Sequence, residues 1–258
     1  MNPVLFKLYG PLAIHMYGLC IALGAIISFY LFNKDPKIKT YFSQHTLITV
    51  LQLIIIGAYV GGRVVCILTD YKSVDAWWLL VKFWEPGFSI LGSMIGIALV
   101  LPLYLHLHKI PLLAFLDRAS IYAPLVQTFG RLGCFFTGCC YGKPTQAWYG
   151  IVYTHQNHVA PLHCSLHPTQ LYSSLMLFCI FLFLYFIQQH RTRKTGVIFL
   201  SYIILMATER FLIDFVRWDR IFVYEPTFLQ LFSIHQWIAL GICTLATIGA
   251  IVLSKSKA

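Results

Sequence analysis

The sequence predicts an all-α membrane protein, a bundle of about seven transmembrane helices with a loop or cap around residues 136–167 on its outer face. Three observations lead to this fold class. Hydrophobic residues make up 59% of the 258 residues and charged residues only 11%, which exceeds the apolar content of an ordinary soluble domain. Apolar runs long enough to cross about 30 Å of hydrocarbon recur along the chain. Lysines and arginines gather in alternate loops.

The apolar runs define the expected helices in order. A small-residue cleavage site is missing near the N-terminus, so the first run is expected to stay as a helix. Asp117, Arg118 and Arg131 interrupt the fourth run, and hydropathy alone would then give six spans. No linker or repeat divides the chain, so residues 1–258 are predicted to form a single integral membrane domain. The expected spans are 11–32, 46–69, 88–108, 112–135, 168–188, 196–216 and 233–253.

The basic residues predict the orientation. By the positive-inside rule, loops rich in lysine and arginine lie in the cytoplasm, which places the N-terminus in the periplasm and the C-terminus in the cytoplasm. The net charge of +10 reflects this topology and an affinity for anionic lipid headgroups, and no nucleic-acid signature accompanies it. The basic loop residues are Lys34, Lys37, Lys39, Lys109, Arg191, Arg193, Lys194, Lys255 and Lys257.

With this topology, every expected helix carries a polar group at one depth, the outer third of the bilayer. Arg63, Arg131 and Arg210 lie near the ends of outward-running spans. An ionisable residue within a span is costly and usually faces a cavity or a partner, although an arginine near a helix end can also extend to the interface. The spans that begin outside open with His15, Tyr17, Ser89, His167, Gln170, Ser233 and Gln236.

Three arginines in a partly dehydrated cavity need an anion, and a phosphate matches the paired donors of guanidinium. Arg131 is flanked by Gly130 and Gly133, which would let a neighbour or ligand approach closely. Arg210 and Asp214 are four residues apart on one helix face, so they can form an intrahelical ion pair that positions the arginine.

Small residues four apart predict where helices approach closely. Gly57 with Gly61 and Gly92 with Gly96 have this spacing within expected spans. Gly138 and Gly142 have it too, but they follow the fourth span and are expected to shape a loop. The connection at 136–167 is the longest, and such a loop is either functional or a structured cap.

The segment FGRLGCFFTGCCYGKPT at 129–145 resembles the signature of the prolipoprotein diacylglyceryl transferase family. Other blocks resemble that family in the same order, so the resemblance covers nearly the whole chain. They are HMYGLCIALG at 15–24, GGR at 61–63, GFSILGSMIG at 87–96, HPTQLY at 167–172, ERFLIDFVR at 209–217 and SIHQW at 233–237.

The resemblance implies a bacterial inner-membrane enzyme that transfers diacylglyceryl from phosphatidylglycerol to the lipobox cysteine thiol of a preprolipoprotein and releases glycerol phosphate. The substrate supplies the thiol, so the enzyme needs no cysteine nucleophile of its own. No cofactor and no metal are expected. The resemblance implies that Arg131 and Arg210 bind the phosphate with help from Arg63, and that Asp214 orients Arg210. It implies that Tyr17 contacts the headgroup or the thiol. Further substrate contacts are implied for Gln170, His167, Gln236 and Gly142.

The chain departs from the family pattern at three positions. Leu91 stands where the family commonly has a histidine considered for proton abstraction, which leaves His15 and His167 as candidate bases. Cys134 replaces the signature asparagine and Cys139 a downstream acidic residue. The departures also allow a divergent paralogue acting on another phospholipid.

The cysteines leave two further alternatives open. A cluster on the outer side could contain four cysteines and two histidines: Cys134, Cys139, Cys140, Cys164, His163 and His167. It could form a disulfide, for example between Cys139 or Cys140 and Cys164. It could also bind a metal ion, although the spacing of the residues matches no zinc pattern. A membrane thiol-redox protein would use these cysteines but would not need three arginines. An anion carrier would need polar residues through the cytoplasmic half, where only Asp117 and Arg118 occur.

Overall fold

The computed structural model of the chain describes residues 4–9, 12–70, 74–82, 85, 87–188, 194–222 and 230–255. The chain divides into two compact units, Met1–Phe32 with Leu116–Ala258 (unit 1) and Asn33–Phe115 (unit 2). Each unit is described by itself. The single domain expected from the sequence stays a prediction.

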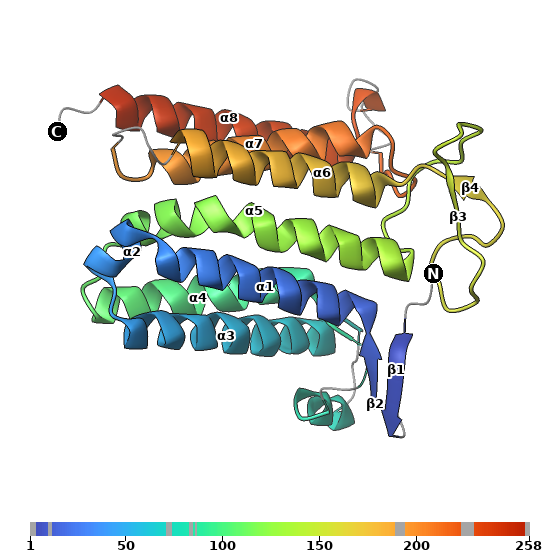
Figure 1. Ribbon diagram of the computed structural model, residues 1–258, viewed down its shortest axis with the longest axis horizontal. Helices are drawn as coiled ribbons and strands as arrows, with labels where there is room; N and C mark the ends of the chain where they lie inside the picture. Colours follow the sequence, from blue (N-terminus) through green and yellow to red (C-terminus); the bar gives the residue numbers. More distant parts are fainter. Residues whose placement is uncertain are drawn as a thin grey trace. The chain divides into compact units, whose positions relative to one another are not determined.

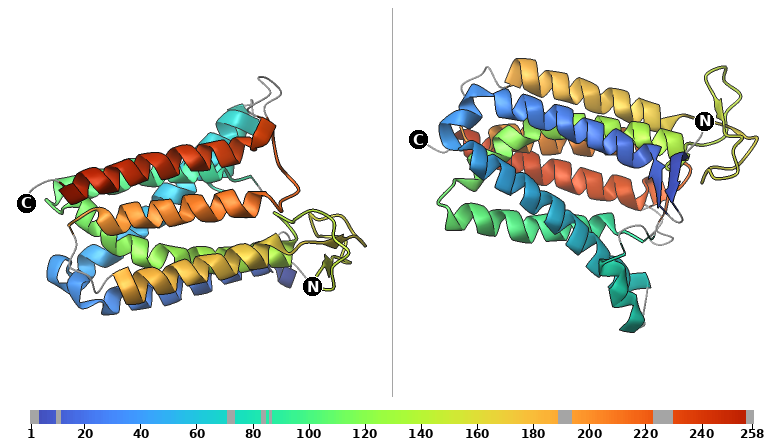
Figure 2. Two further views of the ribbon diagram at one scale, coloured as in Figure 1. Left: turned by 90° about the horizontal axis from the view of Figure 1, so that it is seen from above. Right: turned by 60° about the horizontal axis from the view of Figure 1, so that its bottom comes forward.

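Unit 1 is a bundle of long helices. Its helices are α1 (Met16–Lys34), α5 (Leu112–Thr137), α6 (Thr169–Leu182, continued by a π-helical stretch Phe183–Gln188), α7 (Val197–Asp214) and α8 (Ile234–Lys255), the first two crossing the unit boundary by a few residues. Helices α6, α7 and α8 lie side by side, and α5 runs along the same bundle (Figures 1 and 2). The C-terminal ends of α5 and α7 and the N-terminal ends of α1, α6 and α8 lie at the same end of this bundle (Figure 1).

Unit 2 contains the short helix α2 (Pro36–Tyr41), the long helices α3 (Gln44–Asp70) and α4 (Ile90–Leu107), and a 3₁₀ helix at Val74–Leu80. The sequence did not predict α2. Asp35 caps it by accepting a hydrogen bond from the Lys37 amide at 2.9 Å, and Pro36 occupies the first helical position, where a missing N–H costs nothing.

The predicted glycine contact between α3 and α4 is confirmed. A Cβ on Gly61 would overlap the carbonyl oxygen of Gly92, and one on Gly96 would overlap that of Gly57. The two backbones therefore touch where side chains would hold them apart.

The first helix begins later than the apolar run at 11–32 suggested. Residues Leu12–His15 form strand β2, which pairs antiparallel with β1 (Val4–Tyr9), and α1 starts at Met16. Hydropathy reports the apolar character of this stretch but not the pairing of its backbone with an earlier segment, so it could not place the start of the helix.

Several described helices are long and apolar enough to cross a membrane. They are α1, α3, α4, α6 with its π-helical extension to Phe186, and α8, five in all among the described residues. Helices α5 and α7 match two further expected spans in position but carry more charge. The chain is therefore an all-α, multi-pass membrane protein, and the count of seven crossings stays a prediction.

Asp117, which interrupts the fourth apolar run, binds the N-terminus of α7. Its two carboxylate oxygens accept hydrogen bonds from the backbone amides of Gly196 at 2.6 Å and Phe199 at 2.8 Å. These amides are at the N-terminus of α7, where unpaired donors and the helix dipole favour a negative charge. The acid in α5 thus fixes the beginning of α7.

The segment after α5 is a structured cap without a helix. Strands β3 (Ile151–Val152) and β4 (Ser165–Leu166) pair antiparallel, and Tyr153, Ala160 and Leu166 form a small buried cluster. The cap around 136–167 predicted from the sequence is confirmed as an element of the fold.

Candidate active site

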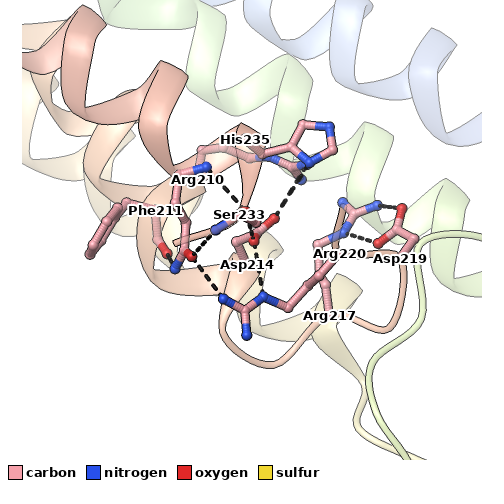
Figure 3. Close-up of polar contacts among 9 residues, drawn as sticks. Arg210, Phe211, Asp214, Arg217, Asp219, Arg220, Ser233 and His235 are labelled. Carbon is pink, nitrogen blue, oxygen red and sulfur yellow. Dashed lines mark hydrogen bonds and ion pairs between the residues drawn. The ribbon is translucent and has the colours of Figure 1, made fainter. Parts of the chain in front are cut away.

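The buried carboxylate of Asp214, at the C-terminal end of α7, is the centre of a polar cluster (Figure 3). Arg220 Nε donates to its Oδ2 at 3.3 Å, and Ser233 Oγ donates to the same oxygen. Arg210 Nη2 lies 3.6 Å from Oδ1, and His235 Nδ1 lies 3.9 Å from it. A charge with 1% exposure is tolerated because these partners compensate its lost hydration.

Gln236, near the start of α8, holds this cluster together. Its Oε1 accepts from Arg220 Nη2 at 2.8 Å and from the Ser233 amide at 3.0 Å, and its Nε2 donates to the Phe211 carbonyl at 3.2 Å. The side chain is fully buried. The amide thus makes hydrogen bonds with Arg220, Ser233 and Phe211, and its expected substrate contact stays a prediction.

Three arginines, Arg131, Arg210 and Arg217, form a second group, here called the arginine cluster. Arg210 lies close enough to both others to interact electrostatically with them. Arg131 and Arg210 come from the C-terminal parts of α5 and α7, and Arg217 follows α7 directly. Like charges repel one another, so a group of three arginines favours a bound anion.

Arg217 is held by a carboxylate of its own. Its Nε and Nη2 donate to the two oxygens of Asp219 at 2.7 and 2.5 Å, a bidentate pair that Figure 3 shows beside Asp214. Burial alone would lower the pKa of Arg217, but the hydrogen bonds to Asp219 and the nearby Cys140 raise it. The hydrogen bonds from Arg217 lower the pKa of Asp219 in turn. Both groups stay charged at neutral pH.

Residues 138–145, here called the signature loop, bind to the end of α7 through the backbone. The Lys143 amide donates to the Val216 carbonyl at 2.9 Å, and the Trp218 amide donates to the Tyr141 carbonyl at 3.3 Å. A Cβ on Gly142 would come within 2.6 Å of the His167 Cβ, so only glycine fits there. Gly142, expected to contact substrate, is packed against protein.

Side chains of α6 fix the same loop from the other side. Gln170 Nε2 donates to the Cys139 carbonyl at 2.7 Å, and Thr169 Oγ1 donates to the Cys140 carbonyl at 2.7 Å. Gln170 also donates to the Tyr153 hydroxyl at 3.4 Å, and burial raises the pKa of Tyr153 to about 12, so this hydroxyl stays protonated. Gln170 thus holds the loop through its Nε2, and its expected substrate contact stays a prediction.

The loop brings three of the four outer cysteines together. The Sγ atoms of Cys134, Cys139 and Cys140 all lie within 4.8 Å of one another, and these residues could hold a metal ion. Hydrogen bonds from the other two thiols lower the pKa of Cys140, helped by Arg217 and Arg131. Cys164 lies apart, against the small hydrophobic cluster of the cap, and all eight cysteines are free thiols.

Tyr17 lies next to this group. It is the second residue of α1, and a Cβ on Gly133 would come within 2.9 Å of its Cδ2, so the ring packs on that glycine. Tyr17 also interacts electrostatically with Cys134 and Arg131. The close approach expected at Gly133 is present, whereas Gly130 faces open space.

Other predicted residues have different surroundings. Arg63 belongs to unit 2, where its guanidinium donates to the carbonyls of Lys82, Glu85 and Gly87 at 3.2, 2.7 and 2.6 Å, which ties α3 to the segment before α4. Both of its Nη atoms donate within its own unit.

In the described part of the chain, no hydrogen bond or ion pair links either candidate base to the arginine cluster. His15 ends β2, where its backbone pairs with Val4, and it is exposed. His167 is half-buried in the cap, with Nδ1 3.3 Å from the Tyr172 hydroxyl. Leu91, at the position that resembles the family histidine, is an exposed residue of α4 in unit 2.

Several site residues escaped the sequence reasoning. Arg217, Asp219 and Arg220 follow α7 and resembled ordinary loop charges, although their spacing from Asp214 in ERFLIDFVRWDR was a usable signal. Glu209 is a further acid within a predicted span; it is 2% exposed and accepts a hydrogen bond from Ser173 Oγ.

The family model and three relatives that match this chain carry descriptions that name the same transferase. A sequence model described as prolipoprotein diacylglyceryl transferase matches residues 3–252. A phosphatidylglycerol–prolipoprotein diacylglyceryl transferase of Clostridium tetani is 37% identical over 219 residues, covering 85% of this chain and 86% of the relative. One of Clostridium perfringens is 33% identical over 220 residues (85% and 84%), and one of Dehalococcoides mccartyi is 31% identical over 219 residues (84% and 82%).

Proposed function

Because the chain belongs to the prolipoprotein diacylglyceryl transferase family, we propose that it transfers the diacylglyceryl group of phosphatidylglycerol to the lipobox cysteine thiol of a preprolipoprotein, with the arginine cluster binding the phosphate. The observation that supports this use of the site is the gathering of Arg131, Arg210 and Arg217 in one electrostatically interacting group. Their charges do not depend on pH in the physiological range.

The reaction makes two demands on the site. The thiol sulfur forms a bond to the glyceryl carbon, the bond from that carbon to the phosphate oxygen breaks, and glycerol phosphate departs with the electron pair. The nucleophile must be a thiolate, and the growing negative charge on phosphate must be stabilised. Guanidinium groups placed before the reaction provide that stabilisation without reorganisation.

The other residues position the arginines. Asp214 orients Arg210 and Arg220, and Gln236 holds Arg220. The hydroxyl of Tyr17 contacts the headgroup or the incoming thiol, since its ring borders Gly133 beside Arg131. In this proposal Gln170 and Gly142 act by fixing the signature loop.

The proposed orientation places the N-terminus in the periplasm and the C-terminus in the cytoplasm of a bacterial inner membrane. The site then faces the outer leaflet. Green fluorescent protein fused after Ala258 should fluoresce, and alkaline phosphatase inserted at Asn157, an exposed cap residue, should be active. The opposite pair of results would reverse the orientation.

The decisive experiment uses the purified protein with labelled phosphatidylglycerol and a lipobox peptide. Wild-type protein should form a thioether-linked diacylglyceryl peptide, and a peptide with serine in place of cysteine should form none. The variant Lys39→Ala, which changes an exposed residue of α2, serves as a matched loss of one positive charge. The proposal fails if wild type forms no thioether, or if Arg131→Ala is as active as Lys39→Ala.

A further inference from the structure

The cysteine cluster, Cys134 with Cys139 and Cys140, has the geometry of a partly closed metal site. The three Sγ atoms lie within 4.8 Å of one another. Zinc–thiolate bonds of about 2.3 Å in a tetrahedral arrangement place two sulfurs roughly 3.8 Å apart. Small side-chain rotations would therefore bring all three sulfurs onto one ion.

The backbone is shaped to make this convergence. Cys140 has a φ of 57° and Gly138 a φ of 74°, so two of three consecutive residues have a left-handed backbone conformation. A non-glycine residue in that conformation is strained and persists where the surroundings enforce it. Here Thr169 and Gln170 provide the enforcement by holding the carbonyls of Cys140 and Cys139.

The charges around the cluster suit a thiolate-bound cation. Three thiolates and one divalent ion carry a net charge of −1, and Arg131 and Arg217 lie close enough to Cys140 to offset it. A second contact orients one ligand, because the Thr137 hydroxyl lies 3.3 Å from Cys139 Sγ and donates to it. The cluster also adjoins the phosphate-binding arginines.

We propose that Cys134, Cys139 and Cys140 bind one thiophilic divalent metal ion, such as Zn²⁺, whose fourth position receives the thiol of the substrate cysteine. This inference rests on the proposed function. Three protein ligands with an open fourth position characterise catalytic zinc sites, whereas structural sites have four. A thiol bound to such an ion is deprotonated, which supplies a nucleophile in a chain that has Leu91 at the family's histidine position.

The step balances without an oxidant or a further co-reactant. The substrate thiol loses its proton to solvent as its sulfur binds the metal. The metal-bound thiolate then forms the bond to the glyceryl carbon, while the bond from carbon to phosphate oxygen breaks and the arginine cluster receives the glycerol phosphate. The thioether product, which is neutral, binds the ion more weakly and can leave.

Metal binding is tested first, with a readout independent of activity. Reduced, full-length protein in detergent is titrated with Cd²⁺, and sulfur-to-metal charge transfer is followed in the ultraviolet. Wild type should bind about one equivalent, and the double variant Cys139→Ser/Cys140→Ser should lose the band. The matched control Cys164→Ser, which changes a cysteine of the cap outside the cluster, should keep it.

Folding is checked by size-exclusion chromatography, and Cys140→Ser alone serves if the double variant aggregates. No stoichiometric charge-transfer band in wild type would overturn the proposal. So would a band of equal strength in both cluster variants, or a disulfide in place of metal under reducing conditions.

The substrate's place on the ion is tested by adding lipobox peptide to the Cd²⁺-loaded protein. The peptide with cysteine should increase the band by about one third, from three thiolates to four, and the peptide with serine should not. Equal effects of the two peptides would overturn the fourth-ligand assignment.

Transfer assays separate this proposal from the proposed function. Thioether formation that is unchanged in Cys139→Ser/Cys140→Ser and after chelation refutes a catalytic metal and leaves the transferase intact. A metal-loaded wild type that forms no thioether refutes the transferase and leaves the metal-binding site.

Discussion

The arginines of the site differ in how many of their donors are already used. Arg217 and Arg220 donate to carboxylates and to Gln236. In the described part of the chain, the Arg210 side chain makes one ion pair, at 3.6 Å, and the Arg131 guanidinium makes no hydrogen bond or ion pair. Arg131 and Arg210 therefore have donors to offer a ligand.

Removing either of these two arginines should slow transfer strongly. We expect Arg131→Ala and Arg210→Ala each to reduce the rate of thioether formation by about 10²–10³, as for the loss of one preorganised donor to a developing negative charge. Lysine at either position should restore little, because it cannot form the paired hydrogen bonds of guanidinium. Initial rates with labelled phosphatidylglycerol measure this, and rates within threefold of wild type would contradict it.

Loss of the Asp214 carboxylate should destabilise the fold as well as the activity. Asp214→Ala leaves Arg220 and Ser233 without their buried partner, and breaking a buried ion pair of this kind costs about 3–5 kcal/mol. Thermal unfolding in detergent should show a clear decrease in Tm. The exposed Asp219, replaced by asparagine, is the comparison, and an equal decrease in both variants would refute the central role of Asp214.

Acid should remove the contribution of the pair between Asp219 and Arg217. The hydrogen bonds from Arg217 lower the pKa of Asp219 below its unfolded value of about 3.9. The pair therefore adds stability above pH 4, and this stability is lost as the pH falls through the lowered pKa. The difference in Tm between wild type and Asp219→Asn should be constant from pH 5 to 8 and shrink below about pH 4. A difference that grows in acid would contradict the assignment.

At the level of residues, the sequence predicted the charges within helices better than the charges after them. Arg131, Arg210 and Asp214 stood out because an ionised group in an apolar run is costly. Arg217 and Arg220 did not stand out, because a charged residue in a loop does not interrupt an apolar run. The role of Arg220 depends on a turn after α7 that brings it back to Asp214, and only the folded chain shows that turn.

At the level of elements, the glycine contact between α3 and α4 makes a sharp prediction. Gly61→Ala places a methyl group against the backbone of Gly92 and Gly96, and such overpacking costs about 1–3 kcal/mol. The control Gly241→Ala, in α8 with open space around it, should be neutral or gain about 0.5–1 kcal/mol. Thermal unfolding in detergent compares the two, and equal Tm values would contradict the close contact.

The long helices could be located from apolar runs, but the short elements between them and the contacts across the fold could not. The seven predicted runs match long helices of the described residues within a few residues at most ends, while the number of membrane crossings stays a prediction. Hydropathy missed β1 with β2 and the short α2, because one depends on pairing with a distant segment and the other on a cap at Asp35. The roles of Gln170 and Gly142 as supports for the signature loop were also out of reach, since both depend on contacts across the fold.

At the level of the whole molecule, composition and loop charge were enough to predict an all-α membrane protein. The expectation that polar groups meet at one depth of the bilayer stays a prediction; in unit 1, the site residues come from helix ends at the same end of the bundle (Figure 1). These residues are Tyr17, Arg131, Gln170, Arg210, Asp214 and Gln236. No reasoning from sequence could choose which of their side chains face a ligand and which hold the others in place.

The cap that Asp117 forms on α7 has a mechanical consequence for catalysis. Helices α5 and α7 are fastened at one end by this carboxylate and at the other by the backbone bonds between the signature loop and Val216. Two helices that are connected at both ends keep a constant separation. In the proposed function, Arg131 on α5 and Arg210 on α7 are therefore held at a separation that the two helices set before any headgroup enters.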